Sequence, residues 1–193
     1  MSRQDAVSSN SLGFLTVVEH ADHGLFGGYL VLDFAGRPLE FHCTAPVKPN
    51  RAQEILYGPT LQGFLFGEQI GQTLIQQTKK PPRLVCTDRL PAMSARGLVA
   101  SPLALVMPPE SITAEPVGGE TGGRFFRVDG PHLGTPRLAA FTVGSRRLAV
   151  CQSHAEDQQQ AAECVAELAE GFDLAEPFER IRAAIEEAQQ AAR

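Results

Sequence analysis

The chain has 193 residues, of which 43% are hydrophobic and 20% are charged, and its net charge is -5. This length and composition are typical of one globular domain and exclude wholesale disorder. The sequence holds no apolar run of the roughly 20 residues needed to cross a bilayer, and residues 1–10 lack the apolar segment of a signal peptide. We therefore expect a cytoplasmic protein with no membrane partner, in which the four cysteines are free or metal-bound.

The acidic net charge also argues against nucleic acid, because proteins that bind it usually present a basic surface. Basic clusters in the sequence are small, and the absence of Trp together with only two Tyr leaves little aromatic surface on which bases could stack. Nucleic acid is therefore not expected as a partner, and the composition indicates no particular protein partner.

Three segments near the N-terminus predict an antiparallel meander. Residues 13–19 and 27–34 are rich in β-branched and apolar side chains, and residues 38–44 alternate apolar with polar ones. A tight turn at Ala35 and Gly36 joins the last two strands as a hairpin. We expect an α/β fold, with α+β as the alternative, whose mixed sheet begins with this three-stranded meander.

A long helix is predicted from Leu61 to about Lys79, after a short helix that Asn50 opens through a capping box with Gln53. A strand at residues 83–88 follows, so this helix is a crossover between parallel strands. Three glycines share one face of the helix, and each costs about 1 kcal/mol relative to Ala. Close approach of another backbone would offset that cost, from the chain's own sheet, a neighbouring helix or the same helix in a homodimer. These glycines are Gly63, Gly67 and Gly71.

The rest of the chain completes the sheet and adds two C-terminal helices. Ser153 with Glu156 predicts the start of the first, and a narrow apolar stripe marks the second. We divide the chain into a disordered tail at residues 1–10, one α/β domain at 11–172 and a C-terminal helix at 173–193. The further strands are expected near residues 103–106, 124–128, 137–143 and 147–152, with a Pro- and Gly-rich loop at 108–123.

Seven of the nine His and Cys residues fall at four predicted strand ends. Three of these ends share one sheet edge, and the direction of the last strand decides whether the fourth joins them. Imidazole and thiolate are the ligands that zinc prefers, so the sequence predicts a protein of unknown activity that binds zinc or another transition metal. Buried core cysteines with loop histidines are the competing interpretation. The seven residues are His20, His23, His42, Cys43, Cys86, Cys151 and His154.

A second interpretation uses carboxylates. Three strands, a helix and a fourth strand, with acids on the first strand, the helix and the fourth strand, resemble the order of the ribonuclease H-like fold. The acids here are Glu19, either Glu54 or Glu68, and Asp88. The resemblance implies a nuclease whose clustered carboxylates hold two Mg²⁺ ions about 4 Å apart. The first acid of that fold is normally Asp, and this chain departs from it with Glu19.

Two other functions stay open at this point. Cys151 directly precedes a predicted helix start, which makes it the best-placed thiol for nucleophilic catalysis. The alternative from a different class is a non-catalytic scaffold that self-associates through the glycine-bearing helix face. The sequence leaves open whether the protein is an enzyme.

Overall fold

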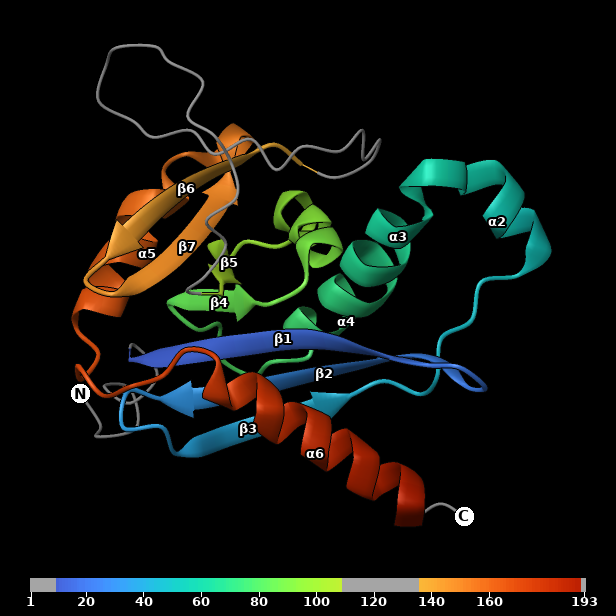
Figure 1. Ribbon diagram of the computed structural model, residues 1–193, viewed down its shortest axis with the longest axis horizontal. Helices are drawn as coiled ribbons and strands as arrows, with labels where there is room; N and C mark the ends of the chain where they lie inside the picture. The colour runs from blue at the N-terminus through green and yellow to red at the C-terminus, as the bar shows by residue number, and fades with distance from the viewer. Residues whose placement is uncertain (1–9, 109–135, 192–193) are drawn as a thin grey trace.

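The computed structural model describes residues 10–108 and 136–191. Its centre is a seven-stranded mixed sheet with the order β3-β2-β1-β4-β5-β7-β6. Helices cover both faces of this sheet, and α6 lies across β1 and β2 opposite the helix labelled α3 and α4 (Figure 1). The prediction of an α/β fold with a mixed sheet is therefore confirmed.

The first three strands form the predicted meander. β1 (Ser11–His20) pairs antiparallel with β2 (Gly24–Asp33), which pairs antiparallel with β3 (Pro38–Cys43). β1 is buried along most of its length because helices cover both of its faces, which explains its nearly continuous apolar sequence. Its side chains alternate, so Leu12 and Phe14 point to one face and Leu15 and Val17 to the other.

The crossover runs through a short helix and then one long helix to the fourth strand. Asn50 and Gln53 form the predicted capping box at the start of α2 (Arg51–Tyr57). β4 (Leu84–Thr87) then lies parallel to β1, as expected for a crossover. The segments between them are η1 (Gly58–Thr60), α3 (Leu61–Gly63), η2 (Phe64–Gln72) and α4 (Thr73–Gln76).

The glycine-bearing face of the long helix packs against η3 (Leu90–Leu98) of the same chain. A Cβ added at Gly67 would lie 2.7 Å from Cβ of Ser94 and 2.8 Å from the backbone nitrogen of Ala95. A Cβ added at Gly71 would lie 3.2 Å from Cβ of Ala95. Gly63, Gly67 and Gly71 are all buried. Of the three alternatives left open by the sequence, the neighbouring backbone is that of η3 in the same chain, so the alternative of a homodimer through this face is corrected.

The other half of the sheet combines one parallel and two antiparallel strands. β5 (Leu103–Met107) is parallel to β4, and β7 (Arg146–Cys151) is antiparallel to β5. β6 (Leu138–Val143) forms the predicted hairpin with β7. Apart from Pro108, the loop predicted at residues 108–123 and the strand predicted at 124–128 lie outside the described residues.

Two helices follow β7. After η4 (Gln152–His154), α5 (Asp157–Ala166) begins without the predicted capping box, because the Ser153 hydroxyl pairs with Nδ1 of His154 at 3.0 Å instead. α6 (Glu176–Ala191) presents the predicted apolar stripe to the sheet. The stripe residues Leu174, Phe178, Ile181 and Ile185 are buried, whereas Ala188 is exposed.

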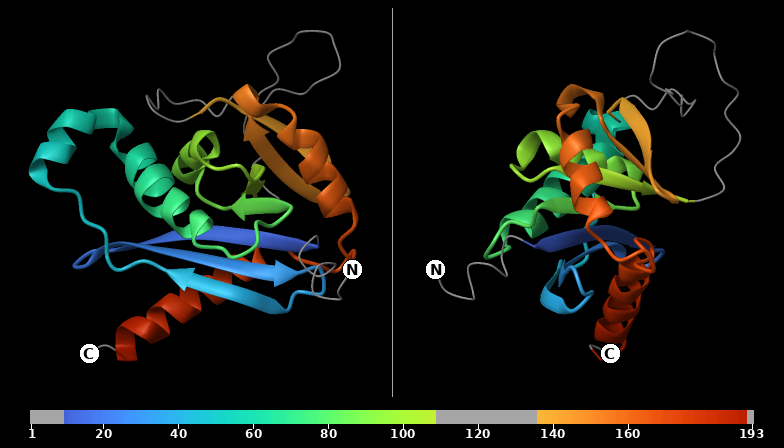
Figure 2. Two further views of the ribbon diagram at one scale, coloured as in Figure 1. Left: turned by 180° about the vertical axis from the view of Figure 1, so that it is seen from behind. Right: turned by 90° about the vertical axis from the view of Figure 1, so that its left-hand side faces the viewer.

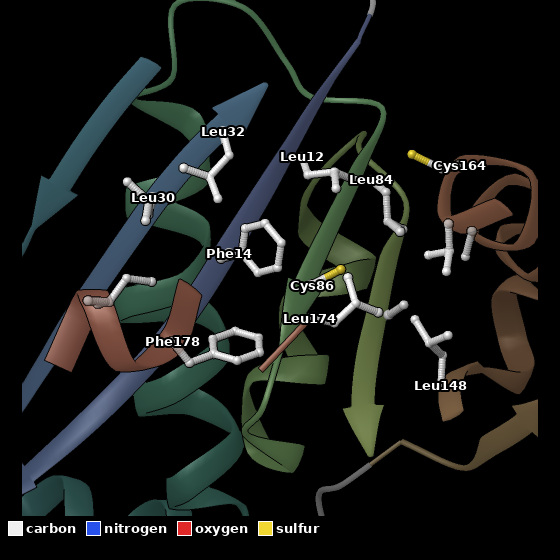
Figure 3. Packing of buried hydrophobic residues seen from close by; sticks show 14 of the residues in the cluster. Leu12, Phe14, Leu30, Leu32, Leu84, Cys86, Leu148, Cys164, Leu174 and Phe178 are labelled. Atoms are coloured by element: carbon white, nitrogen blue, oxygen red, sulfur yellow. The ribbon is translucent and has the colours of Figure 1, made fainter. Parts of the chain in front are cut away.

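The sheet separates two hydrophobic cores. One lies between the sheet and the helices α5 and α6, and we call that side the α6 face. The other lies under the long crossover helix and η3, and we call it the α4 face. Figure 2 shows the helical elements on opposite sides of the strands, and Figure 3 shows Phe14, Cys86 and Phe178 within the α6-face core.

Both cores approach β2 closely at Gly27 and Gly28. A Cβ added at Gly27 would lie 2.9 Å from Cδ1 of Leu74 on the α4 face. A Cβ added at Gly28 would lie 2.9 Å from Cδ1 of Ile185 on the α6 face. The paired glycines therefore let helices pack tightly on both sides of one strand. Within residues 10–108 and 136–191, no helix is long and apolar enough to cross a membrane.

Candidate functional site at the carboxyl edge of the sheet

A polar cluster lies on the α6 face where β1 passes the end of β4. Asp88 directly follows β4, and its Oδ1 accepts a hydrogen bond from the Thr16 hydroxyl at 2.6 Å. Thr16 is fully buried within the apolar run from Gly13 to Val18, so this hydroxyl requires a polar partner. The two residues are brought together by the parallel pairing of β1 with β4, which aligns Leu15 with Thr87.

Arg182 supplies the third member of the cluster from α6. Its Nη2 donates to Oδ2 of Asp88, and its Nη1 donates to Oε1 of Glu179 at 2.6 Å. The side chain of Arg182 is 34% exposed and that of Asp88 is 19% exposed. Both oxygens of the Asp88 carboxylate thus receive protein donors, and its charge is compensated by one guanidinium.

Two hollows flank Arg182. The larger has a volume of about 560 Å³ and lies at the ends of β4 and β5 and the start of β7, beneath α6. The smaller, of about 290 Å³, lies beside Val18 and His20 at the end of β1. Carboxyl ends of parallel strands are where open α/β sheets bind ligands, so this edge is the candidate site.

The larger hollow combines an apolar wall with a charged rim. Its wall includes Met107, Phe172 and Phe178, and its charged residues include Arg147 and Asp173. A volume of this size and a lining of this kind suit an organic ligand with one apolar and one charged part.

Arg146 also lines the hollow, but its role there is structural. Its guanidinium donates to the backbone oxygen of Val165, in the last turn of α5, at 3.0 Å and to that of Phe172, beyond the end of α5, at 2.9 Å. It also reaches the carbonyl of Ala169 at 2.5 Å. A cation at this position satisfies carbonyls that the end of a helix leaves without partners.

The structure does not bring the seven predicted His and Cys ligands together. β7 is antiparallel to β5, so Cys151 and His154 lie at the sheet edge opposite His20. Cys43 and Cys86 lie on strands separated by β2 and β1, about 14 Å apart at ordinary strand spacing. A zinc ion reaches thiolates only at about 2.3 Å. The described residues hold no group of three His, Cys, Asp or Glu that could bind a metal ion.

The individual histidines have other neighbours. The rings of His20 and His23 lie 4.6 Å apart between centroids, on the loop that joins β1 to β2. Nε2 of His42 lies 3.1 Å from a carboxylate oxygen of Glu40 on the same strand. These arrangements are local pairs, and no third possible metal ligand among the described residues joins either of them.

Three of the four thiols are buried in the cores. Burial, together with a smaller contribution from nearby Asp157, raises the pKa of the Cys151 thiol to about 11. Burial likewise raises the pKa of Cys164 to about 11, and it raises the pKa of Cys86 as well. Cys151 donates to the backbone oxygen of Met93 at 3.7 Å. These are the properties of core cysteines, which remain protonated and unreactive near neutral pH.

The predicted carboxylates are likewise separated. Glu19 shares the side-chain orientation of Leu15 and Val17 and therefore points to the α4 face, opposite Asp88. Glu54 is exposed on α2, where it pairs with Arg51 at 2.9 Å. Glu68 is exposed on η2, the helix that covers the α4 face. Asp88 is the one predicted acid that lies in the candidate site.

This arrangement does not fit a pair of Mg²⁺ ions. Such a site needs several carboxylates or carbonyls converging from different elements. Here Asp88 meets a hydroxyl from β1 and a guanidinium from α6, so its neighbours are hydrogen-bond donors. No hydrolytic step through a metal ion is derived from these residues.

Comparison with known proteins identifies a similar fold. No family model and no curated protein matches the sequence. The crystal structure of human ENDOV is similar over 96% of this chain and 87% of that chain, with a TM-score of 0.53 and 14% identity. A Ciona intestinalis endonuclease V, solved in complex with a 23mer DNA containing an inosine followed by a ribo-adenosine, covers 93% of this chain and 86% of its own. Its TM-score is 0.49 and its identity 13%.

The similarity to human ENDOV shows the fold, and it corrects two expectations. The expectation of a metal site built from His and Cys is corrected, because the described residues form no such group. The expectation of an uncharacterised or non-catalytic scaffold protein is corrected as well, because the structure of similar fold is an endonuclease. The expectation that nucleic acid is not a partner is corrected for the same reason. The net charge of the whole chain does not exclude a local binding surface, because it averages over the whole molecular surface.

Sequence reasoning missed Thr16 and Arg182. In the sequence, Thr16 fits the pattern of one more β-branched residue in a buried strand, although it is the only hydroxyl in the run from Gly13 to Val18. Arg182 lies among several charged residues of α6, and the sequence alone gives no sign that it faces Asp88. The hydroxyl inside an apolar run was the one available signal, because a buried hydroxyl needs a partner.

Proposed function

We propose that this chain binds nucleic acid along the carboxyl edge of β1, β4 and β5, with Arg182 and Asp88 at the centre of contact. The observation that carries this proposal is the placement of the Thr16, Asp88 and Arg182 cluster between two hollows at this edge. A fold similar to that of human ENDOV supports it, because the same type of sheet serves an endonuclease there.

Arg182 has the chemistry to bind a phosphate. A guanidinium carries five N–H donors, and Asp88 and Glu179 occupy two of its nitrogens. Since the side chain is 34% exposed, its remaining donors are accessible to a phosphate oxygen. Contacts of this kind supply much of the affinity for nucleic acid and weaken as salt rises.

The larger hollow has room for one unstacked base beside that phosphate. Phe172 and Phe178 line it, and aromatic rings or apolar walls are the usual surfaces for a base that has left its stack. A single strand or a locally opened duplex is therefore the form of nucleic acid that we propose this edge binds.

A second candidate function is phosphodiester cleavage that depends on Asp88. The position of this acid at the end of β4, in a fold similar to that of an endonuclease, favours it. Glu19, Glu54 and Glu68 do not join Asp88 on the α6 face, so Asp88 is the residue on which this proposal rests.

Binding and cleavage can be measured on the same samples. Short labelled single-stranded DNA and RNA would be titrated with protein, followed by fluorescence anisotropy and by electrophoresis after incubation with Mg²⁺ or Mn²⁺. We expect Arg182→Gln to weaken binding about tenfold, which corresponds to about 1.4 kcal/mol. Under the second candidate function, the natural chain cleaves the strand and Asp88→Asn does not.

Arg180→Gln is the matched control for this experiment. Arg180 lies on the same helix and pairs with Glu176 at 2.7 Å and with the backbone oxygen of Gly36 at 3.1 Å, and it lines neither hollow. Its removal should leave the affinity within about twofold. Equal losses in both variants, or no loss in Arg182→Gln, would argue against the proposed edge.

We also propose a reducing compartment such as the cytoplasm for this protein. Cys86, Cys151 and Cys164 are free and buried, and Cys43 is free and exposed. Four unpaired thiols are usual where glutathione and thioredoxin keep cysteines reduced.

A further inference from the structure

The Asp88 carboxylate has no oxygen left without a protein donor. Oδ1 accepts a hydrogen bond from the Thr16 hydroxyl at 2.6 Å, and Oδ2 accepts one from the Arg182 guanidinium. Each oxygen keeps a second lone pair, but a divalent cation bound there would lie beside the Arg182 guanidinium, and like charges at this distance repel. Arg182 therefore disfavours a metal ion at Asp88.

Arg182 is also held from its other side. Its Nη1 donates to Oε1 of Glu179, three residues earlier on α6, at 2.6 Å. Ile181 and Ile185, on either side of Arg182 in the sequence, are buried against the sheet and fix the helix beneath it. The guanidinium therefore occupies a defined place between the two hollows, as a bound ion would.

We propose that Arg182 is the resident cation of this edge and takes the place of a divalent metal ion in holding the phosphate. This inference rests on the proposed function and deepens it. Binding of nucleic acid at this edge does not require a metal ion, and Asp88 orients the guanidinium. A guanidinium can hold a phosphate in place of a metal ion because it forms directional, paired hydrogen bonds with phosphate oxygens.

The same reasoning distinguishes Arg from Lys at position 182. Lys would keep the charge but present a single ammonium in place of a planar fork, so it cannot contact Asp88, Glu179 and a phosphate with separate nitrogens. Arg182→Lys should therefore recover only part of the affinity that Arg182→Gln loses, and its salt dependence should remain close to that of the natural protein.

Metal binding itself provides the first test, and it needs no nucleic acid. Free Mn²⁺ would be followed by electron paramagnetic resonance as protein is added, for the natural chain, Asp88→Asn, Arg182→Gln and Arg180→Gln. We expect the natural chain to bind no Mn²⁺ through Asp88 with a Kd below about 1 mM, the range of weak oxygen-ligand sites. The natural chain and Asp88→Asn should therefore give the same titration. A site that the natural chain has and Asp88→Asn lacks would overturn the proposal.

Nucleic-acid binding provides the second test. Anisotropy titrations with single-stranded DNA would be run in Mg²⁺ and in EDTA. The Kd of the natural chain should agree within about twofold between the two buffers, and Arg182→Gln should bind about tenfold more weakly in EDTA. A loss of about tenfold or more for the natural chain in EDTA would overturn the proposal. Circular dichroism of each variant would show that it is folded.

The two tests separate this inference from the proposed function. Absence of nucleic-acid binding in both buffers would remove the proposed function, and the role of Arg182 in phosphate binding with it. An Mn²⁺ site that depends on Asp88 would instead remove the inference alone, and it would leave nucleic-acid binding with a metal ion in place.

Discussion

Asp157 and Arg96 form a buried ion pair that joins the two helical layers. The Asp157 carboxylate, 1% exposed, accepts hydrogen bonds from Nε and Nη2 of Arg96 at 2.5 and 2.9 Å. It also accepts a hydrogen bond from the backbone N–H of Leu103 at 3.3 Å. Asp157 begins α5 on the α6 face, whereas Arg96 belongs to η3 on the α4 face, so the pair connects these layers at the start of β5.

Asp157→Asn should lower the free energy of unfolding by about 3–5 kcal/mol, because it leaves a largely buried guanidinium without its charge partner. Urea denaturation followed by circular dichroism would measure the change. The matched control is Glu167→Gln, which breaks the more exposed bidentate pair of Glu167 with Arg83. That variant should change little, since solvent screens exposed pairs. Similar losses in both variants would contradict the prediction.

Gly67→Ala should destabilise the protein by about 1–3 kcal/mol, the usual cost of overpacking a core. The added Cβ would lie 2.7 Å from Ser94 and 2.8 Å from the backbone of Ala95, so the long helix and η3 would have to separate. Gly97→Ala is the control, since a Cβ there meets nothing within 4 Å. Thermal denaturation of the two variants would decide, and equal midpoints would show that the packing of η3 is looser than described.

Thiol labelling of the folded protein should modify one cysteine quickly. Cys43 is exposed at the end of β3, whereas Cys86, Cys151 and Cys164 are 0–2% exposed. A thiol reagent at about pH 8 should therefore react with one thiol per chain before denaturant is added and with all four afterwards. Cys43→Ser should abolish the fast phase, and rapid labelling of a second thiol would contradict the burial of the other three.

Stability should fall as the pH rises from about 9 to about 11. Burial raises the pKa of Cys151 and Cys164 from the ordinary value of 9.0 to about 11, so the folded chain retains protons that the unfolded chain releases. The contribution of these two protonated thiols to the free energy of unfolding is fully present below pH 9, and it is lost as the pH rises through their pKa values in the folded chain. Urea midpoints at about pH 8 and about pH 10 would measure this, and the double variant Cys151→Ala, Cys164→Ala should show a smaller fall.

Much of the fold could be predicted because local patterns specify it. The meander follows from three segments of strand-like sequence, and the capping box of Asn50 with Gln53 is present as expected. The crossover rule placed β4 parallel to β1. The division into a tail, one domain and a C-terminal helix stays a prediction. Ser153 failed as a helix cap because its hydroxyl pairs with His154, a choice that depends on side-chain geometry.

The candidate site could be predicted only in part. Asp88 was found because it ends a recognisable strand, and it does lie at the proposed edge. The predicted His and Cys site failed for two reasons: β7 runs antiparallel to β5, which removes Cys151 and His154, and the strand order keeps Cys43 apart from Cys86. Strand direction and strand order are set by tertiary contacts far apart in sequence. Arg182 could not be found because 94 residues separate it from Asp88, and only the packing of α6 brings them together.

At Gly27 and Gly28 of β2, helices on both faces pack directly against the strand backbone. Leu74 of the crossover helix and Ile185 of α6 approach Gly27 and Gly28 from opposite sides, so the two helices press on one strand there. Any side chain at Gly28 would lift α6 by pushing against Ile181 and Ile185, and it would carry Arg182 away from Asp88. The position of the Arg182 guanidinium beside Asp88 therefore depends on the missing side chain at Gly28, on a strand that contributes no residue to the site.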